Sequence, residues 1–309
     1  MKFDVIIGNP PYQLNDGGGA GDSSVPLYDK FIEKSLELNP KFMCMIIPSR
    51  WMVGGKGLNK FRAEMINNGK FKIIHDYENS QELFPNVGVN GGINYFLWDK
   101  DHKGEVEYFF HKKNGEVKRS NRKLKNKISG YVIRNNEDAT LIENIFKKSK
   151  NFFSDIVSSG DPYGFRTDAF NKKDIGLSNE KSDFNCIMFG VKKTKRTHMY
   201  VDKKYITKNK DNIDKFKLFF PSVFGTETTL LPEIIIGEKD SICTGSFIEI
   251  GPFNDKIELE NCLKYMRTKF FRYLFHVNKY SYGMSKRTFS LIPLQDWSKP
   301  WTDEELYKK

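Results

Sequence analysis

The stretch FDVIIGNPPY, residues 3–12, decides the fold of the first part of the chain, because an apolar strand runs directly into two prolines. Three more apolar segments follow at 42–48, 71–77 and 93–98. Continuous apolar runs of this length are typical of the central strands of a sheet that is covered on both faces. The sequence therefore predicts a set of buried strands in this part of the chain.

Helical segments separate the first three of these strands. Residues 24–39 and 58–68 have apolar side chains at helical spacing, with turn signals at their ends. This order predicts an α/β sheet, and ligands of such sheets bind beyond the carboxyl ends of the strands. We expect residues 9–12, 48–50 and 79–90 to share that edge.

Beyond about residue 104 the chain changes to short strand-like pieces and basic segments, which predict mixed α+β structure. We therefore expect a first domain at 1–104 and a second at 105–309. In the second domain, short strands are predicted at 105–110, 217–220, 233–238 and 246–251, and helices at 137–150 and 258–277.

The net charge of +11 belongs to the second predicted domain. Residues 1–104 contain 12 Lys and Arg and 12 Asp and Glu, so the whole excess lies in residues 105–309. A cationic excess of this kind favours a polyanionic partner such as nucleic acid. A solvated, lysine-rich surface is the alternative.

The remaining composition argues against several classes of protein. The four cysteines form no CxxC pair and the five histidines have no metal-ligand spacing, so neither a disulfide framework nor a metal site is predicted. His75, inside an apolar segment, is expected to be a satisfied core or edge histidine. No segment approaches the roughly 18 apolar residues of a membrane span and no secretory signal is visible, so we expect a cytoplasmic protein without membrane contact.

Asn9, Pro10, Pro11 and Tyr12 have the chemistry to hold an extruded nucleobase. Consecutive prolines fix φ and remove two backbone donors, which leaves their carbonyl groups free to accept hydrogen bonds in a preset direction. Asn9 adds a side-chain carbonyl, and two converging acceptors suit an exocyclic amino group. The ring of Tyr12 offers a stacking face worth on the order of 1–3 kcal/mol per base. A rigid turn without a ligand is the alternative.

An apolar strand followed by Asn-Pro-Pro-Tyr resembles the amino-group DNA methyltransferases of restriction-modification systems, in which this motif binds the target adenine. The resemblance covers about residues 1–104 and extends more weakly into the basic half. It implies a partial Rossmann-like methyltransferase sheet followed by an α+β target-recognition domain. The implied activity is methylation of adenine N6 in double-stranded DNA, after base flipping, with S-adenosylmethionine as the methyl donor.

Residue by residue, the resemblance implies that Asn9 and the Pro10 carbonyl accept hydrogen bonds from adenine N6, and that Tyr12 stacks on the ring. Pro11 completes the motif. Phe84 matches an aromatic residue that closes the opposite face of the base, but a loop-anchoring aromatic has the same pattern.

Two basic segments, 112–127 and 191–205, are candidates for DNA contact, and solvated loops are the alternative. The lysines are expected to contact the DNA backbone, whereas asparagine and arginine side chains suit base edges. The candidate DNA-binding residues are Arg119, Asn121, Arg122, Lys192, Lys193, Lys195 and Arg196.

The family normally places a glycine-rich turn, which binds S-adenosylmethionine, before the Asn-Pro-Pro-Tyr motif. The closest candidate here, residues 221–231, has one glycine where two are required. We therefore expect an incomplete cofactor site, and a second chain or further segment that completes it and pairs with the open edge of the first strand. The alternative is a noncatalytic DNA-binding specificity subunit or a degenerate methyltransferase remnant.

Overall fold

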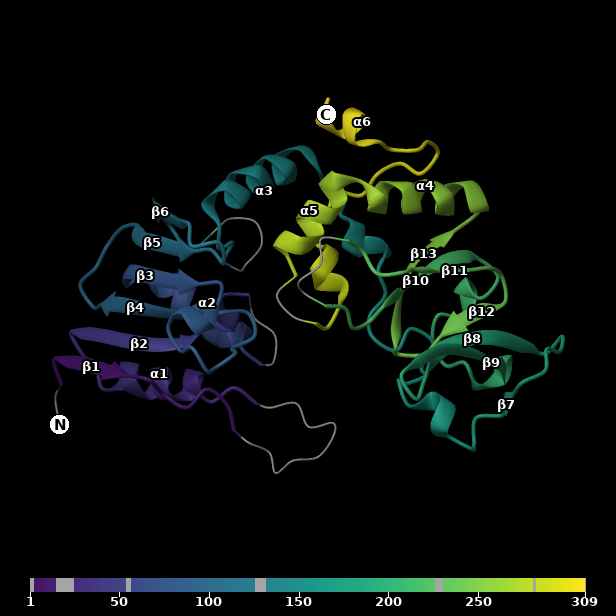
Figure 1. Ribbon diagram of the computed structural model, residues 1–309, viewed down its shortest axis with the longest axis horizontal. Helices are drawn as coiled ribbons and strands as arrows, with labels where there is room; N and C mark the ends of the chain where they lie inside the picture. Colours follow the sequence, from purple (N-terminus) through teal and green to yellow (C-terminus); the bar gives the residue numbers. More distant parts are fainter. Residues whose placement is uncertain are drawn as a thin grey trace. The chain divides into compact units, whose positions relative to one another are not determined.

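The computed structural model describes residues 3–14, 25–53, 57–125, 132–225, 230–279 and 282–308. The chain divides into two compact units, Met1–Phe146 and Lys147–Lys309, and each is described by itself (Figure 1). The boundary predicted at residue 104 instead lies inside the first unit. The reason is that two further strands, β5 (Val106–His111) and β6 (Val117–Arg122), extend the first sheet.

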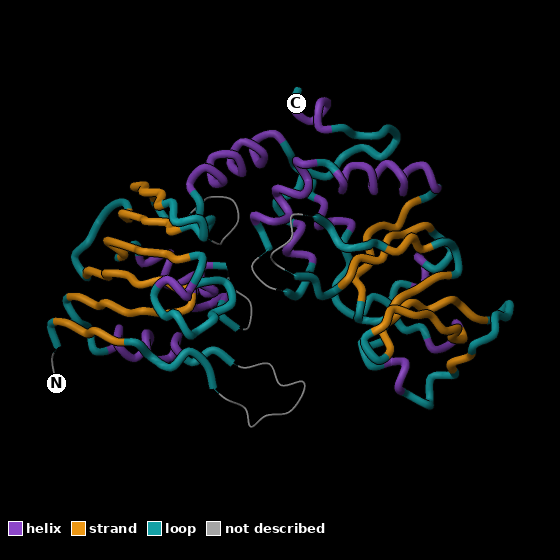
Figure 2. The backbone as a smooth tube through the Cα atoms, viewed as in Figure 1, coloured by secondary structure: helices purple, strands orange, loops and turns teal. Residues whose placement is uncertain are grey.

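The first unit contains a six-stranded sheet with the order β1-β2-β4-β3-β5-β6 (Figure 2). Strands β1, β2, β3 and β5 run in one direction, and β4 and β6 run in the other. The predicted α/β class is confirmed. The other strands and α-helices that begin in this unit are β1 (Val5–Gly8), α1 (Tyr28–Glu37), β2 (Phe42–Pro48), α2 (Asn59–Asn68), β3 (Phe71–Tyr77), β4 (Ile93–Asp99) and α3 (Asn136–Lys148).

Helices α1 and α2 pack on one face of this sheet through a chain of aromatic side chains. Tyr28 of α1 meets Phe61 of α2 edge to face, with 6.3 Å between ring centroids. Trp51 meets Phe61 in turn and stacks on Phe71 of β3 at 5.5 Å. All four side chains are at most 3% exposed. Because burial of a large apolar side chain contributes roughly 1.5–3 kcal/mol, this cluster holds both helices against the sheet.

The opposite face of the sheet is only partly covered by the described residues, which differs from the expectation for continuous apolar strands. In β1, Val5 is 50% exposed and Ile7 is 77% exposed. On the neighbouring strand β2, Phe42, Cys44 and Ile46 are half-buried, whereas the alternate residues are buried. The physical reason is that α1 and α2 meet each other on a single face of the sheet.

The second unit contains two smaller sheets, ordered β11-β10-β13 and β12-β8-β9-β7. Met188 of one sheet and Phe219 of the other belong to the same buried cluster, so the two sheets share a core. The strands are β7 (Leu177–Ser178), β8 (Asn185–Lys192), β9 (Lys195–Asp202), β10 (Phe216–Pro221), β11 (Ile235–Gly237), β12 (Ser241–Cys243) and β13 (Phe247–Phe253).

The helix predicted at 258–277 is two helices, α4 (Lys256–Arg267) and α5 (Lys269–Val277). They meet at Thr268, whose backbone is extended and whose hydroxyl accepts a hydrogen bond from the Phe271 N–H at 3.2 Å. The apolar stripe continues across this break, so periodicity alone predicts one helix. A short helix, α6 (Asp303–Tyr307), follows. No helix in the described part of the chain has the length and apolar character that a membrane crossing requires.

Candidate functional site

The Asn-Pro-Pro-Tyr corner lies at the surface of the first unit, at the carboxyl end of β1. Asn9 and Pro11 are exposed, Pro10 is buried and Tyr12 is half-buried. The segment behind the corner holds it in place, because the Leu27 N–H donates a hydrogen bond to the Tyr12 carbonyl at 3.1 Å. A ligand therefore has access to the Asn9 side chain, while the backbone that carries it is anchored.

The side chain of Tyr12 is half-buried and neutral. Burial raises the pKa of Tyr12 to about 12, so the phenol stays neutral near pH 7. Its hydroxyl group is buried and has no hydrogen-bond partner among the described residues. An unsatisfied buried hydroxyl of this kind costs roughly 1–3 kcal/mol.

The topology brings the predicted ligand-binding segments to one edge of the sheet. Because β1, β2 and β3 are parallel to each other, the residues that follow them, Asn9, Ser49 and Glu78, lie along the same edge. Short 3-10 turns begin at that edge after β2, at Ser49–Met52, and shortly after β3, at Ser80–Glu82. The shared edge that the sequence predicted is present.

Phe84 lies in a closed loop after β3 and is half-buried. Its N–H donates to the Ser80 carbonyl at 2.9 Å, and its carbonyl accepts from the Val87 N–H at 2.9 Å. Two strands separate β1 from β3, a spacing of about 14 Å between their axes. Contact of Phe84 with a base that stacks on Tyr12 would require this loop to reach back along the sheet edge, and it stays a prediction.

A buried ion pair that sequence reasoning missed lies beneath this edge. Asp76 of β3 is fully buried and accepts two hydrogen bonds from Arg134, from Nε at 2.5 Å and from Nη2 at 2.6 Å. The Ser49 hydroxyl donates to the same carboxylate at 2.5 Å, and the Tyr108 hydroxyl donates at 2.6 Å. The only sequence signal was a charged residue within an apolar strand, and nothing indicated its partner 58 residues away.

Arg134 also fixes the segment that returns from β3 to β4. Its Nη1 donates to the Gly91 carbonyl at 2.9 Å, and its Nη2 donates to the Tyr77 carbonyl at 3.2 Å. The adjacent Gly92 has φ of +84°, and a Cβ atom there would lie 2.1 Å from the Tyr77 carbonyl oxygen and 2.9 Å from Arg134 Nη2. One guanidinium thus holds the loop that carries Phe84.

Gly92→Ala is therefore expected to lower the free energy of unfolding by about 2 kcal/mol or more, since a left-handed backbone and a close contact both oppose the added methyl group. Gly88→Ala in the same loop is the matched control, because no atom lies within 4 Å of its added Cβ. Chemical denaturation of both variants measures the difference. Equal stabilities would contradict this account of Gly92.

The first group of predicted DNA-binding residues, Arg119, Asn121 and Arg122, lies on β6 and thus in the first unit. Arg119 and Asn121 are exposed. Arg119 forms an ion pair with Glu107 at 2.5 Å. Arg122 is half-buried and donates to the carbonyls of Ile133 at 2.5 Å and Arg134 at 3.0 Å. Arg122 therefore helps to position the segment that carries Arg134, a role that the sequence did not predict.

The second group, Lys192, Lys193, Lys195 and Arg196, lies together at the tip of the β8–β9 hairpin in the second unit, and all four are exposed. Lys193 and Thr194 form a tight turn with φ of 47° and 68°, and strands flank this turn on both sides. Most of the basic segment 191–205 is therefore strand rather than loop.

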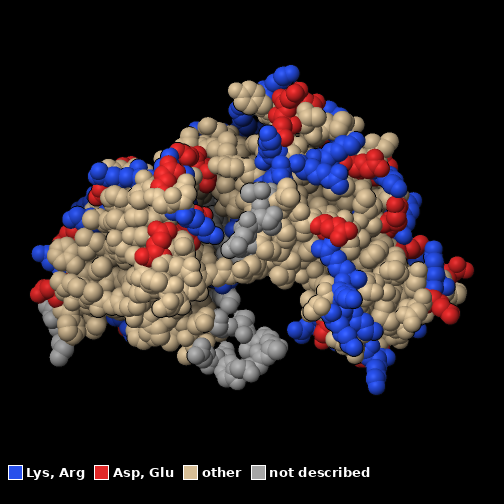
Figure 3. All heavy atoms as spheres, in the orientation of Figure 1, with Lys and Arg blue, Asp and Glu red and all other residues tan. Residues whose placement is uncertain are grey.

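Figure 3 shows a stripe of lysine and arginine side chains on the visible face of this unit. Arg196 pairs with the Glu233 carboxylate at 3.1 Å.

Sequence comparison shows that part of this chain is similar to methylases. An uncharacterized adenine-specific methylase of Mycoplasma pneumoniae (strain ATCC 29342 / M129 / Subtype 1) is 39% identical over 108 residues, which cover 34% of this chain and 26% of that protein. Residues 1–84 match the Eco57I restriction-modification methylase family. The predicted resemblance to adenine-specific methylases of restriction-modification systems is confirmed.

The fold is similar to that of a larger enzyme. The structure of the Type IIL restriction-modification enzyme MmeI in complex with DNA has a TM-score of 0.50 and 11% identity, over 93% of this chain and 45% of that chain. At this identity the similarity supports the fold alone. The chain spans less than half the length of both relatives.

Proposed function

We propose that this chain forms the target-base pocket and the DNA-recognition part of an adenine-N6 DNA methyltransferase of a restriction-modification system. The observation that carries the proposal is the exposed Asn9 side chain beside two prolines and the neutral, half-buried ring of Tyr12. These groups lie at the edge where α/β sheets bind ligands. The family match of residues 1–84 supports the same function.

In the proposed complex, the side-chain carbonyl of Asn9 and the backbone carbonyl of Pro10 accept hydrogen bonds from the amino group of a flipped adenine. Tyr12 stacks on one face of the ring, and Phe84 closes the other. Flipping costs a few kcal/mol, which one stack of about 1–3 kcal/mol and two hydrogen bonds of about 1 kcal/mol each offset. When fixed oxygens accept both N6 hydrogen bonds, the amino nitrogen is drawn toward tetrahedral geometry. Its lone pair is then available for methyl transfer.

The described residues do not fit a complete S-adenosylmethionine site. The glycine-poor candidate at 221–231 begins at the end of β10, in a sheet whose pairings are antiparallel, rather than after a parallel strand. The parallel strands β1, β2, β3 and β5 are followed by Asn9, Ser49, Glu78 and Lys112 instead of a glycine-rich turn. We therefore assign cofactor binding to a complementary segment or second chain.

The first sheet offers a place for this complementary part. Among the described strands, β1 pairs with β2 alone, so its other edge presents unpaired backbone groups. Val5 and Ile7 on this strand are 50% and 77% exposed. An open edge of this kind favours pairing with another strand, which would extend the sheet next to the Asn9 corner.

The proposal is tested by incubating the chain with labelled S-adenosylmethionine and duplex DNA, alone and with the protein encoded immediately upstream. We expect N6-methyladenine only when the complementary part is present. DNA binding without methylation in any combination would instead favour a noncatalytic specificity subunit or a degenerate remnant.

The exposed hairpin tip is expected to contribute to DNA binding by neutralising phosphates. Lys193→Ala/Lys195→Ala should weaken binding to duplex DNA and reduce the slope of log K against log salt by about 2, since each lost phosphate contact removes about 0.9. Fluorescence anisotropy over a series of salt concentrations measures both quantities. Lys208→Ala/Lys210→Ala, at two exposed lysines of the same unit, is the control. An equal effect of both pairs would argue against a specific role of the hairpin.

A further inference from the structure

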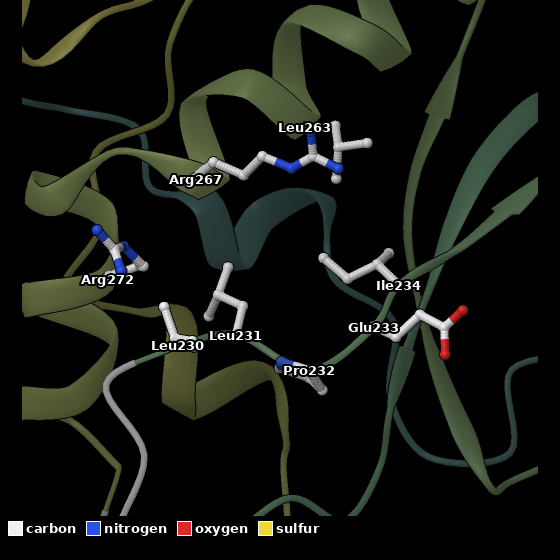
Figure 4. Close-up of a pocket in the computed structure, with 8 residues that line it drawn as sticks. All are labelled: Leu230, Leu231, Pro232, Glu233, Ile234, Leu263, Arg267 and Arg272. Atoms are coloured by element: carbon white, nitrogen blue, oxygen red, sulfur yellow. The ribbon is translucent and has the colours of Figure 1, made fainter.

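A pocket of about 450 Å³ opens in the second unit (Figure 4). Residues 230–234, which lead into β11, form one side of it, and α4 and α5 form the other. Leu231, Pro232 and Leu263 give it an apolar lining, and Arg267 and Arg272 are its two basic residues. None of the functions predicted from the sequence explains a pocket with an apolar lining and two arginines.

The electrostatics of the pocket are cationic. Arg272 is steadied by a hydrogen bond from its Nε to the Thr268 carbonyl at 3.4 Å, which leaves its terminal nitrogens for a ligand. No ion pair between described residues includes Arg267 or Arg272. Glu233 is the one acidic residue of the lining, and its carboxylate is held by Arg196 at 3.1 Å. Figure 4 shows its side chain directed away from both guanidinium groups.

The helix terminus beside the pocket does not supply the positive charge. The first backbone N–H groups of α5, those of Lys269 and Phe270, already donate to the Asp303 carboxylate at 3.1 and 3.2 Å. An anion in the pocket would therefore depend on the side chains of Arg267 and Arg272.

One residue of the basic hairpin contacts the lining of the pocket. Arg196, next to the hairpin tip, donates to the Glu233 carbonyl at 3.0 Å as well as to its carboxylate. This contact joins β9, which begins at the hairpin tip, to one of the residues that line the pocket. We call the hairpin tip and the pocket together the hairpin–pocket surface.

We propose that the pocket binds a backbone phosphate of duplex DNA that lies along the hairpin–pocket surface. The guanidinium groups of Arg267 and Arg272 pair with the phosphate oxygens, because the planar fork of arginine matches phosphate geometry. The leucine and proline side chains contact the neighbouring deoxyribose. This inference rests on the proposed function and adds to it a phosphate clamp in the DNA-recognition part.

The test uses Arg267→Met, Arg272→Met and the double variant, since methionine keeps the apolar stem without the charge. Lys264→Met is the matched control, because Lys264 is an exposed cation of the same helix α4 that does not line the pocket. Binding of a fluorescent mixed-sequence duplex is measured by anisotropy at several salt concentrations. Thermal melting shows whether each variant is folded, and Arg272→Lys provides a milder change if a methionine variant is not.

Each single variant is expected to bind DNA about 10-fold more weakly, as for the loss of a charge-assisted hydrogen bond. The double variant should also reduce the salt slope by about 1, for one lost phosphate contact. Affinity and slope equal to those of Lys264→Met would overturn the inference. Calorimetric binding of inorganic phosphate that depends on both arginines, with unchanged DNA affinity, would also overturn it by assigning the pocket to a free anion.

The two proposals fail in different ways. If the unaltered chain binds no duplex DNA, the proposed function itself is contradicted. If Lys193→Ala/Lys195→Ala weakens DNA binding but the folded arginine variants do not, only the phosphate clamp is rejected.

Discussion

Asn9→Ala is expected to reduce methyl transfer to adenine by about 100- to 1,000-fold when the chain is assayed with its complementary part, a loss typical for a preorganised hydrogen-bonding group aimed at a reacting centre. The alanine variant keeps the two prolines and the anchored backbone but loses the side-chain carbonyl. The amino group would then be held by the Pro10 carbonyl alone. The expected loss is in the rate of transfer, because Asn9 would contact only the flipped base.

The measurement compares initial rates of N6-methyladenine formation for the unaltered chain, Asn9→Ala and Gln13→Ala. Gln13 is an exposed amide on the same corner but outside the motif, so its replacement controls for general disturbance. Affinity for duplex DNA should change little in either variant. Methylation that persists at the normal rate in Asn9→Ala would show that the corner does not bind the target base.

Arg134→Met is expected to lower the free energy of unfolding by about 3–5 kcal/mol, because removal of one partner of a buried ion pair leaves the other charge without compensation. Asp76 is fully buried and receives two of its hydrogen bonds from this guanidinium. The same substitution frees the carbonyls of Tyr77 and Gly91. The loop that carries Phe84 should therefore also lose part of its anchoring.

Arg119→Met is the matched control for this prediction. Arg119 also pairs with a carboxylate, that of Glu107, at 2.5 Å, but its side chain is 65% exposed. An exposed pair of this kind contributes at most about 1 kcal/mol. Denaturation can be followed in the first unit by the fluorescence of its buried tryptophans, Trp51 and Trp98, in a chain whose Trp297 and Trp301 are replaced by phenylalanine. Similar losses in both variants would contradict the importance given to burial of the Asp76 pair.

Local signals in the sequence were sufficient for the elements of the first sheet. The strands at 42–48 and 71–77 have the predicted bounds, because continuous apolar runs between turn signals have few other stable conformations. Gly69 ends α2 with a left-handed backbone, as its position after the helix predicted. The prediction of one helix at 258–277 failed because the capping of α5 by Thr268 leaves the apolar periodicity unchanged.

The sequence by itself determined the strand that precedes Asn9 and the rigid corner behind the proposed chemistry, because prolines and apolar runs act through covalent geometry and local burial. Only the tertiary structure decided where the sheet ends, which face the helices cover and which partner neutralises Asp76. It also joined the β8–β9 hairpin to the pocket lining through the contact of Arg196 with Glu233. These features depend on pairing between residues that are far apart in the chain, and local residue patterns do not predict such pairing.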